Sequence, residues 1–439
     1  MVKKLTKLKL LVIIVLGLSL VAGGGFAAGY WWLQQSGQLP SLLSSPTANQ
    51  ETEFVREVFT LIQNDYWDKI EEPKLVELYM LAIGQVYGPQ SELKTKDLQS
   101  LLENYDQLIK QHPDQNHAEL AASVNDLVLR NLQPANRSMI YTEKNAEDLE
   151  KQVANIDSDT DLFATLDVAP DASASAVEQA YESKVAEIDS TATDSATKTE
   201  MLAEAERAYE TIGNEENRER YSETKVEPTI YGKNLGNNIS YVKVKQFSPT
   251  TIEDLDQILQ KLGANPDSNS LILDLRANIG GAIDGLPYLL GPFIGPNQYA
   301  YQFFSKGETH DFKTKSTKLP SLEQFKKVVV LIDGETQSSA EVMAATFKKY
   351  RVGVLVGAST KGWGTVERVF PLEHQPAESV KYSVFLVHNL TLDEAGEPIE
   401  GKGVTPDIEL SNANWQEQLL GYFSDQDLIK AAVSVVEKK

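Results

Sequence analysis

The stretch that most constrains the fold is residues 328–371, where apolar runs flank a helical pattern. The run from Val328 to Ile332 ends in a polar turn, and Ser338 then opens a helical pattern that extends to Tyr350. A second apolar run and a Gly-rich loop lead into a third strand pattern. Continuous apolar runs of this length are typical of strands buried on both faces of a sheet. We therefore predict a strand–turn–helix–strand unit within an α/β fold.

Ser338 stands where a serine can act as a nucleophile. It follows a buried strand and begins a helix, so its hydroxyl lies beside free backbone N–H groups and the positive helix end, which stabilise an oxyanion. The same residues also fit a capping box, because Ser338-Ser339-Ala340-Glu341 has the S-x-x-E spacing that begins many helices for structural reasons alone. The local pattern leaves both interpretations open.

Three motifs resemble the tail-specific, or C-terminal processing, serine peptidases. Around Ser338 the family pattern is roughly S-A-S-A-S-E-[IV], followed by Tyr-Gly-Arg and then by V-G-x-x-T-x-G-K-G-x-V-Q. The residues of this chain that match it are Glu341-Val342, Tyr350-Arg351, Val356-Gly357, Thr360, Gly362, Gly364 and Val366. Residues 274–281 match D-L-R-x-N-x-G-G, and residues 396–408 match G-x-x-I-x-G-x-G-V-x-P-D-I. The resemblance implies a mixed-sheet peptidase domain over 225–439. It also implies that Ser338 is the nucleophile, with the Gly280 and Ser339 N–H groups as oxyanion donors.

Two departures from the family pattern bear on the chemistry. The family's general-base Lys aligns with Trp363, and the Gln that orients it aligns with Glu367. Trp offers only an N–H donor, and a Ser hydroxyl without a base is a poor nucleophile. Lys361 lies two residues earlier and, in an extended loop, points to the same side, so it is a candidate relocated base with Glu367 beside it. A neighbouring carboxylate favours the charged lysine, and sites tolerate little displacement, so we favour impaired activity.

The first 33 residues predict a transmembrane anchor. Four lysines (Lys3, Lys4, Lys7 and Lys9) precede an apolar run without charges from Leu10 to Tyr30. About twenty apolar residues span a bilayer, and a basic flank stays cytoplasmic. We therefore predict a single-pass cell-membrane protein with a cytoplasmic N-terminus and an extracytoplasmic main body. A cleaved signal peptide is the alternative. Residues 34–52 are rich in Ser, Pro and Gln and predict a flexible linker.

Two helical regions are predicted before the peptidase domain. Residues 53–155 carry apolar positions at helical spacing and predict an N-terminal helical domain, which matches the family more weakly than 238–439 does. Residues 156–224 resemble a degenerate J domain, and the matches include Asp161-Leu162-Phe163, Ala180-Tyr181, Ala208-Tyr209 and Tyr221. A plain helical hairpin is the alternative. Tail-specific peptidases usually carry a PDZ domain here, so the resemblance implies that a small all-α insert takes its place.

The J-like segment lacks the residues that give J domains their activity. The His-Pro-Asp that J proteins place between their two helices is absent, and the loop here is Asp189-Ser190-Thr191-Ala192-Thr193-Asp194. We therefore predict no stimulation of a heat-shock chaperone ATPase. A role in protein contact or spacing is the better prediction for this insert.

Composition excludes several classes of function. A net charge of −22 argues against nucleic acid as a partner of the main body. Five His and no Cys exclude a Cys/His metal site, so we expect no metal and no other cofactor. Three functions remain open: endoproteolysis near protein C-termini, a pseudoprotease or scaffold that binds peptides or partner proteins without cleaving them, and a structural assembly protein at the membrane.

Overall fold

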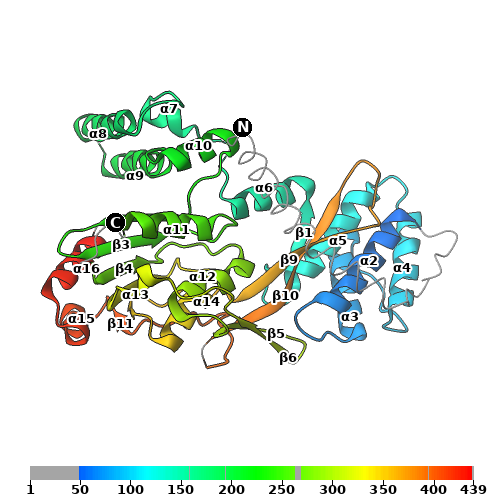
Figure 1. The fold of residues 1–439 in the computed structure, drawn as a ribbon. Coiled ribbons are helices and arrows are strands. Elements are labelled where there is room, and N and C mark those ends of the chain that lie inside the picture. The colour runs from blue at the N-terminus through cyan, green and yellow to red at the C-terminus, as the bar shows by residue number, and fades with distance from the viewer. Residues whose placement is uncertain (1–48, 158, 193, 263–267, 394, 438–439) are drawn as a thin grey trace, which may run out of the picture. The chain divides into compact units, whose positions relative to one another are not determined.

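The structure, a computed structural model, describes residues 49–157, 159–192, 194–262, 268–393 and 395–437 (Figure 1). The predicted anchor at 1–33 lies outside the described residues, as does nearly all of the linker. Within the described ranges, no helix is both long and apolar enough to cross a membrane.

A six-stranded sheet forms the centre of the C-terminal half, in the order β11-β8-β7-β4-β3-β2. Its strands are β2 (Ile230–Asn234), β3 (Ile239–Val244), β4 (Ser270–Asp274), β7 (Lys327–Ile332), β8 (Val354–Gly357) and β11 (Ile408–Glu409). All neighbouring pairs are parallel except β2 and β3, which are antiparallel. The predicted α/β fold with a mixed sheet is confirmed.

Helices cover both faces of this sheet, which explains why its strands are continuous apolar runs. Val330 and Ile332 of β7 pack into one core with α11 (Thr251–Leu262), α12 (Leu286–Ile294), α13 (Pro320–Glu323) and α14 (Ser339–Tyr350). Val329 and Leu331 point to the opposite core, which α15 (Trp415–Phe423) and α16 (Gln426–Glu437) complete. A short 3-10 turn, Ile283–Gly285, precedes α12.

A second sheet is antiparallel and includes β9, the strand that follows the loop after β8. Its strands are β1 (Met139–Thr142), β5 (Tyr299–Ser305), β6 (Glu308–Lys313), β9 (Thr365–Pro371) and β10 (Tyr382–Leu392). The order is β1-β10-β5-β6, and β9 also pairs with β10. Because β1 comes from the N-terminal region, this sheet ties that region to the C-terminal half.

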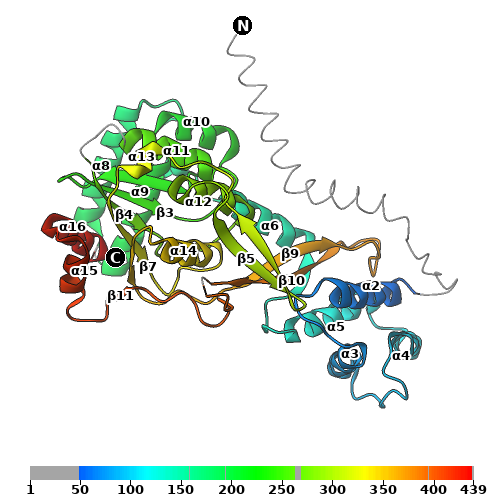
Figure 2. The same ribbon diagram turned by 60° about the horizontal axis from the view of Figure 1, so that its bottom comes forward.

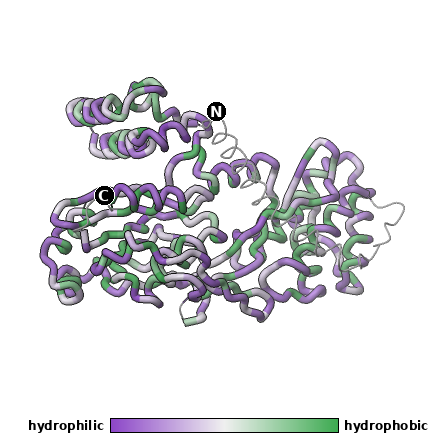
Figure 3. Tube along the Cα trace, viewed as in Figure 1, coloured by the Kyte–Doolittle hydropathy of each residue, from purple (hydrophilic) through white to green (hydrophobic). Residues whose placement is uncertain are grey.

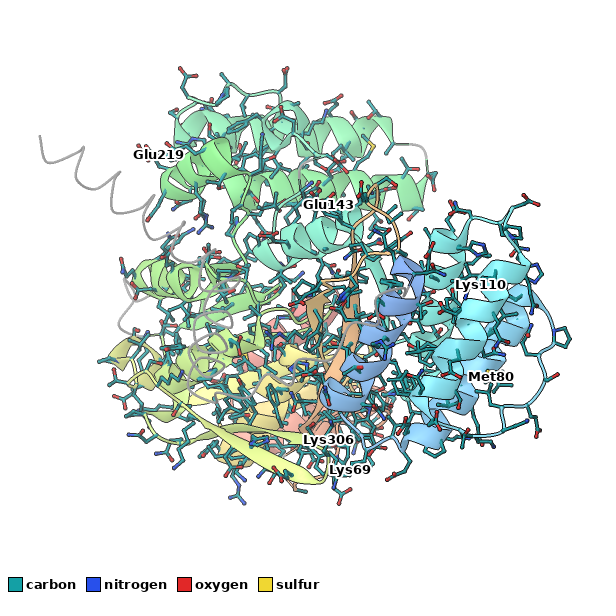
Figure 4. All side chains as sticks on the ribbon, turned by 90° about the vertical axis from the view of Figure 1, so that its right-hand side faces the viewer. Lys69, Met80, Lys110, Glu143, Glu219 and Lys306 are labelled. Carbon is teal, nitrogen blue, oxygen red and sulfur yellow. The ribbon has the colours of Figure 1, made fainter. Side chains whose placement is uncertain are left out.

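The predicted N-terminal helices are α2 (Gln50–Asp65), α3 (Glu72–Tyr87), α4 (Leu98–Gln111), α5 (His117–Asn131) and α6 (Glu143–Ala154). The first four share an apolar core that also takes in Val384 and Leu386 of β10. Figure 4 shows Lys306, in the turn between β5 and β6, near Lys69, in the segment that follows α2. Lys306 Nζ donates to the carbonyl oxygens of Gln63 (2.8 Å) and Asn64 (2.7 Å). A cation there suits the negative C-terminal end of α2.

The insert consists of α7 (Leu162–Leu166), α8 (Ala174–Thr191), α9 (Ser195–Ile212) and α10 (Glu215–Thr224). These helices bury an apolar core of their own, separate from the cores of the sheet. Hydrophobic and hydrophilic segments alternate along them, as expected for helices that bury one face (Figure 3). The group lies beside α11 (Figures 1 and 2), where Arg220 Nη1 donates to Asp254 Oδ1 at 2.8 Å. The likeness to a J domain, and the domain boundaries, stay predictions.

Candidate active site

Ser338 lies in a sharp turn between β7 and α14. Its φ of 56° and ψ of −125° are strained for a residue with a side chain. Glu341 holds this turn, because its carboxylate accepts from Ser338 N at 2.9 Å while its own N–H donates to Ser338 O at 2.8 Å. A strained strand-to-helix turn that presents a serine at a helix start is suited to nucleophilic catalysis.

The loop after β4 lies directly against Ser338. A Cβ added to Gly280 would lie 2.7 Å from Ser338 Cβ and 3.1 Å from Ser338 Oγ, and Gly280 has a φ of +85°. Only glycine suits both this approach and this backbone conformation. Gln337 N also donates to Asn278 O at 2.9 Å. The fold therefore brings together two motifs that are far apart in the sequence.

The two predicted oxyanion donors differ in their surroundings. The Gly280 N–H donates to Asn278 Oδ1 at 2.8 Å, so it is engaged in this conformation rather than available as predicted. The cause is the fully buried Asn278 carboxamide, whose Nδ2 donates to Val244 O at 2.7 Å and whose oxygen needs a donor. Ser339 is in the first turn of α14, where an N–H has no intrahelical acceptor. Its hydroxyl donates to Gly281 O.

Glu341 organises the loop that follows β8. Its fully buried carboxylate accepts from Thr360 Oγ1 (2.5 Å), Gly362 N (2.7 Å) and Trp363 N (2.7 Å), besides Ser338 N. Burial raises the pKa of the Glu341 carboxyl, and these hydrogen bonds oppose that shift. The S-x-x-E pattern indicated a helix cap, but nothing in it indicated that the same carboxylate would also hold the loop.

Trp363, at the position that the resemblance gives to the general base, is fixed by several contacts. Its Nε1 donates to Glu367 Oε1 at 3.1 Å, and its ring centroid lies 3.3 Å from Arg137 Cζ. Glu367 also accepts from Thr365 Oγ1 at 2.5 Å. Burial raises the pKa of Glu367, while the hydrogen bonds and the positive charge of Arg137 lower it.

Lys361 takes a different partner from the one predicted. Its Nζ lies 3.6 Å from Glu335 Oε2, and its backbone N–H donates to Thr336 O at 3.0 Å. Glu367, the predicted partner, is turned to Trp363 instead because the indole N–H offers it a donor in a buried setting. Among the described side chains, none forms a hydrogen bond with Ser338 Oγ. The catalytic roles of Ser338 and Lys361 stay predictions.

Arg137 and Glu400 also belong to the site, although the sequence predicted no role for either residue. Arg137 Nη2 donates to Glu400 Oε1 at 3.2 Å, and Glu400 Oε2 accepts from Gly364 N at 2.8 Å. Both side chains are largely buried, at 17% and 15% exposure. The only signal for Arg137 was its position within residues 53–155, which match the family more weakly than residues 238–439 do.

Comparison with known proteins places this region in a family. Residues 238–410 match the profile of peptidase family S41. This part of the chain belongs to family S41. The carboxy-terminal processing protease CtpA of Bacillus subtilis is 31% identical over 185 residues, which cover 41% of this chain and 37% of the relative. The tail-specific protease of Haemophilus influenzae is 29% identical over 182 residues, covering 39% and 25%. The chain therefore spans well under half the length of these S41 relatives.

Solved structures give a wider but looser likeness. A photosystem II D1 C-terminal processing protease aligns with a TM-score of 0.48 and 16% identity, covering 82% of this chain and 93% of its own. A lipoprotein from Streptococcus agalactiae aligns with a TM-score of 0.45 and 14% identity, covering 88% and 99%.

In the part of the chain that matches S41, Ser338 lies in the turn before α14, and Trp363 lies at the position that the resemblance gives to the general base. No group of three or more His, Asp or Glu able to hold a metal ion occurs in the described ranges.

Proposed function

We propose that this S41 protein binds extended polypeptide segments at Ser338 and cleaves them slowly or not at all. The observation that carries the proposal is the environment of Trp363. The ring donates to Glu367 and lies under Arg137, and Lys361 Nζ lies 5.8 Å from the ring centroid, so the indole, which has no proton acceptor, stands between this lysine and the base position. Without a base, the Ser338 hydroxyl keeps its proton and attacks a peptide carbonyl poorly.

The surface around Ser338 suits a peptide. Ile279, next to Gly280, is an exposed large apolar side chain at 40% exposure. Trp363 is partly exposed and presents a flat aromatic ring. Gly281 is exposed, so its main chain is accessible beside Ile279, while the Cβ directions of Gly280 and Gly281 already face Ser338 and Phe247. Apolar contacts beside accessible main chain are what extended peptide recognition uses.

A relocated Ser338–Lys361 dyad is the second candidate. One observation favours it: the Lys361 side chain is 37% exposed, and its partner Glu335 is 73% exposed. Exposed ion pairs contribute about 0–1 kcal/mol, so substrate binding can release Lys361 from Glu335 at small cost. In this candidate the protein is a slow endopeptidase.

Cleavage of an unfolded protein by the purified full-length chain tests both candidates. The variants are Ser338→Ala, Lys361→Ala and Trp363→Lys, with Lys402→Ala as a control because Lys402 is also an exposed lysine paired with a glutamate. We expect no turnover that depends on Ser338 in the wild type, and a gain in Trp363→Lys. Turnover that is lost in Ser338→Ala and in Lys361→Ala, but kept in Lys402→Ala, would replace the proposal with the dyad.

We also propose that the protein acts outside the cytoplasm, held at the membrane by residues 1–33, and that the insert contacts another protein. The basic and apolar pattern of the N-terminus supports the first part. The separate core of α7–α10 supports the second, because it lets the insert present its own surface. Protease accessibility of the insert in intact cells, compared with lysed cells, tests the location.

A further inference from the structure

Arg137 is an incompletely paired cation at the edge of the serine site. Its Nη2 donates to Glu400 and its guanidinium plane covers Trp363, but Nη1 is shielded from solvent and has no hydrogen-bond partner in the described structure. Buried donors are almost always paired, so an orphan of this kind marks a place where a partner is missing. Such a partner must offer an oxygen acceptor.

The loop that carries Arg137 is fastened on both sides. Trp67 Nε1 donates to Gln133 O at 2.6 Å, and Asn136 N donates to Arg130 O at 2.9 Å. On the other side, Val387 N of β10 donates to Ser138 Oγ at 3.1 Å. Arg137 is therefore held at the serine site from outside the stretch that matches family S41.

The charges around Arg137 decide what kind of oxygen would bind. Glu400 already neutralises the guanidinium at 3.2 Å. Glu367 lies close enough for Arg137 to lower its pKa, and the Glu341 carboxylate is held by neutral donors without a cation among its described partners. A further carboxylate entering this acidic setting would be repelled. A neutral carbonyl oxygen would gain the hydrogen bond without that repulsion.

We propose that Arg137 Nη1 binds a main-chain carbonyl oxygen of the bound peptide, and that the cleft therefore takes internal segments rather than carboxyl-terminal ends. This rests on the proposed function, and it names the ligand class of the same site. Because Nη1 is shielded from solvent in this structure, peptide binding requires the guanidinium to rotate about its contact with Glu400. The rotation changes the stack on Trp363, so peptide binding alters the fluorescence of that indole.

The experiment measures the binding of overlapping fluorescent peptides that together cover the β-casein sequence. Each peptide is made in two forms, one with a free C-terminal carboxylate and one with a C-terminal amide. The full-length chain is compared with Arg137→Gln, Arg137→Lys and the control Arg130→Gln, because Arg130 is a half-exposed arginine paired within α5. We expect Arg137→Gln to weaken binding about tenfold or more, as loss of a charged hydrogen bond does. Arg130→Gln should bind as the wild type does, and free-acid and amide forms should agree within about twofold.

Arg137→Lys distinguishes a loss of binding from a folding defect, because lysine keeps the positive charge beside Glu400 but loses the planar guanidinium and its stack on Trp363. It should fold, with the thermal transition of the wild type, and still bind more weakly. With Trp31, Trp32 and Trp415 replaced by Phe, and Trp67 kept because it fastens the Arg137 loop, peptide should change the emission in the parent more than in Arg137→Lys.

Each outcome separates this inference from the proposed function. Equal binding by the wild type and both Arg137 variants would overturn the role of Arg137 while leaving the peptide cleft in place. Tenfold tighter binding of free-acid peptides would overturn the assignment to internal segments. No binding of any peptide by the wild type would overturn the proposed function, and this inference with it.

Discussion

Replacing Glu341 by Gln tests whether one carboxylate holds both the serine turn and the Trp363 loop. Oε1 accepts from Thr360 Oγ1 and Gly362 N, whereas Oε2 accepts from Ser338 N and Trp363 N. A carboxamide has one oxygen. If its NH2 group faces Ser338 N and Trp363 N, both donors lose their acceptor; if it faces Thr360 and Gly362, the Thr360 hydroxyl can reverse and accept, and Gly362 N alone loses its acceptor. Hydrogen bonds to a charged group contribute about 1.5–3 kcal/mol each, which gives a loss of about 1.5–6 kcal/mol.

The burial of Glu341 sets where in that range the loss falls. Burial raises the pKa of its carboxyl, which means that holding the charge inside has a cost that Gln does not incur. We therefore expect the lower end, about 1.5 kcal/mol, which corresponds to about a tenfold loss of amide protection because 1.4 kcal/mol is tenfold.

Hydrogen exchange of peptides that contain Ser338, Gly362 and Trp363 measures this loss. The matched control is Glu335→Gln in the same turn, because the Glu335 side chain is 73% exposed and should leave protection unchanged. Protection that stays within about threefold of the wild type at both Gly362 and Trp363 in Glu341→Gln would refute the reasoning, since either orientation removes the acceptor of one of these two N–H groups.

Three further outcomes follow from packing and charge. Gly281→Ala should abolish folding or lower the free energy of unfolding by several kcal/mol, because its Cβ would lie 2.0 Å from a main-chain carbonyl oxygen. Gly84→Ala, on an open helix face, should instead stabilise the protein by about 0.5–1 kcal/mol. Urea unfolding of the two variants compares these effects. Burial raises the pKa of Glu210 to about 7, so the stability it contributes is complete below its usual pKa and is lost as pH rises through about 7. Glu210→Gln should flatten that fall between pH 5 and 8, and a slope equal to the wild type would contradict it. Arg220→Ala leaves the buried Asp254 carboxylate short of a cation and should make the insert more sensitive to limited proteolysis, unlike Lys198→Ala at an exposed pair.

Sequence patterns predicted the core of the C-terminal half well because burial there depends on local order. Val328 to Ile332 and Leu271 to Leu273 are apolar at every position, and strands buried on both faces need that composition whatever lies around them. The helical start at Ser338 was likewise visible, since capping depends on residues three apart. The α/β class therefore came from the chain alone.

Side-chain direction in the loops was decided only by the tertiary structure. Lys361 was expected beside Glu367 from its spacing, but a loop residue turns to whichever partner lies nearest, and here that is Glu335. The engagement of the Gly280 N–H likewise depends on a buried carboxamide two residues away whose orientation no spacing rule gives.

By itself the sequence determined that a serine would begin a helix after a buried strand, and that an indole would stand where the family resemblance places a base. It could not determine what surrounds that indole. Arg137 reaches Trp363 from a loop more than two hundred residues earlier, and Glu400, which pairs with Arg137, lies 263 residues after it in the chain. Contacts between such distant segments arise only when the N-terminal helices, β10 and the central sheet have packed, because no local pattern carries information about which segments will meet.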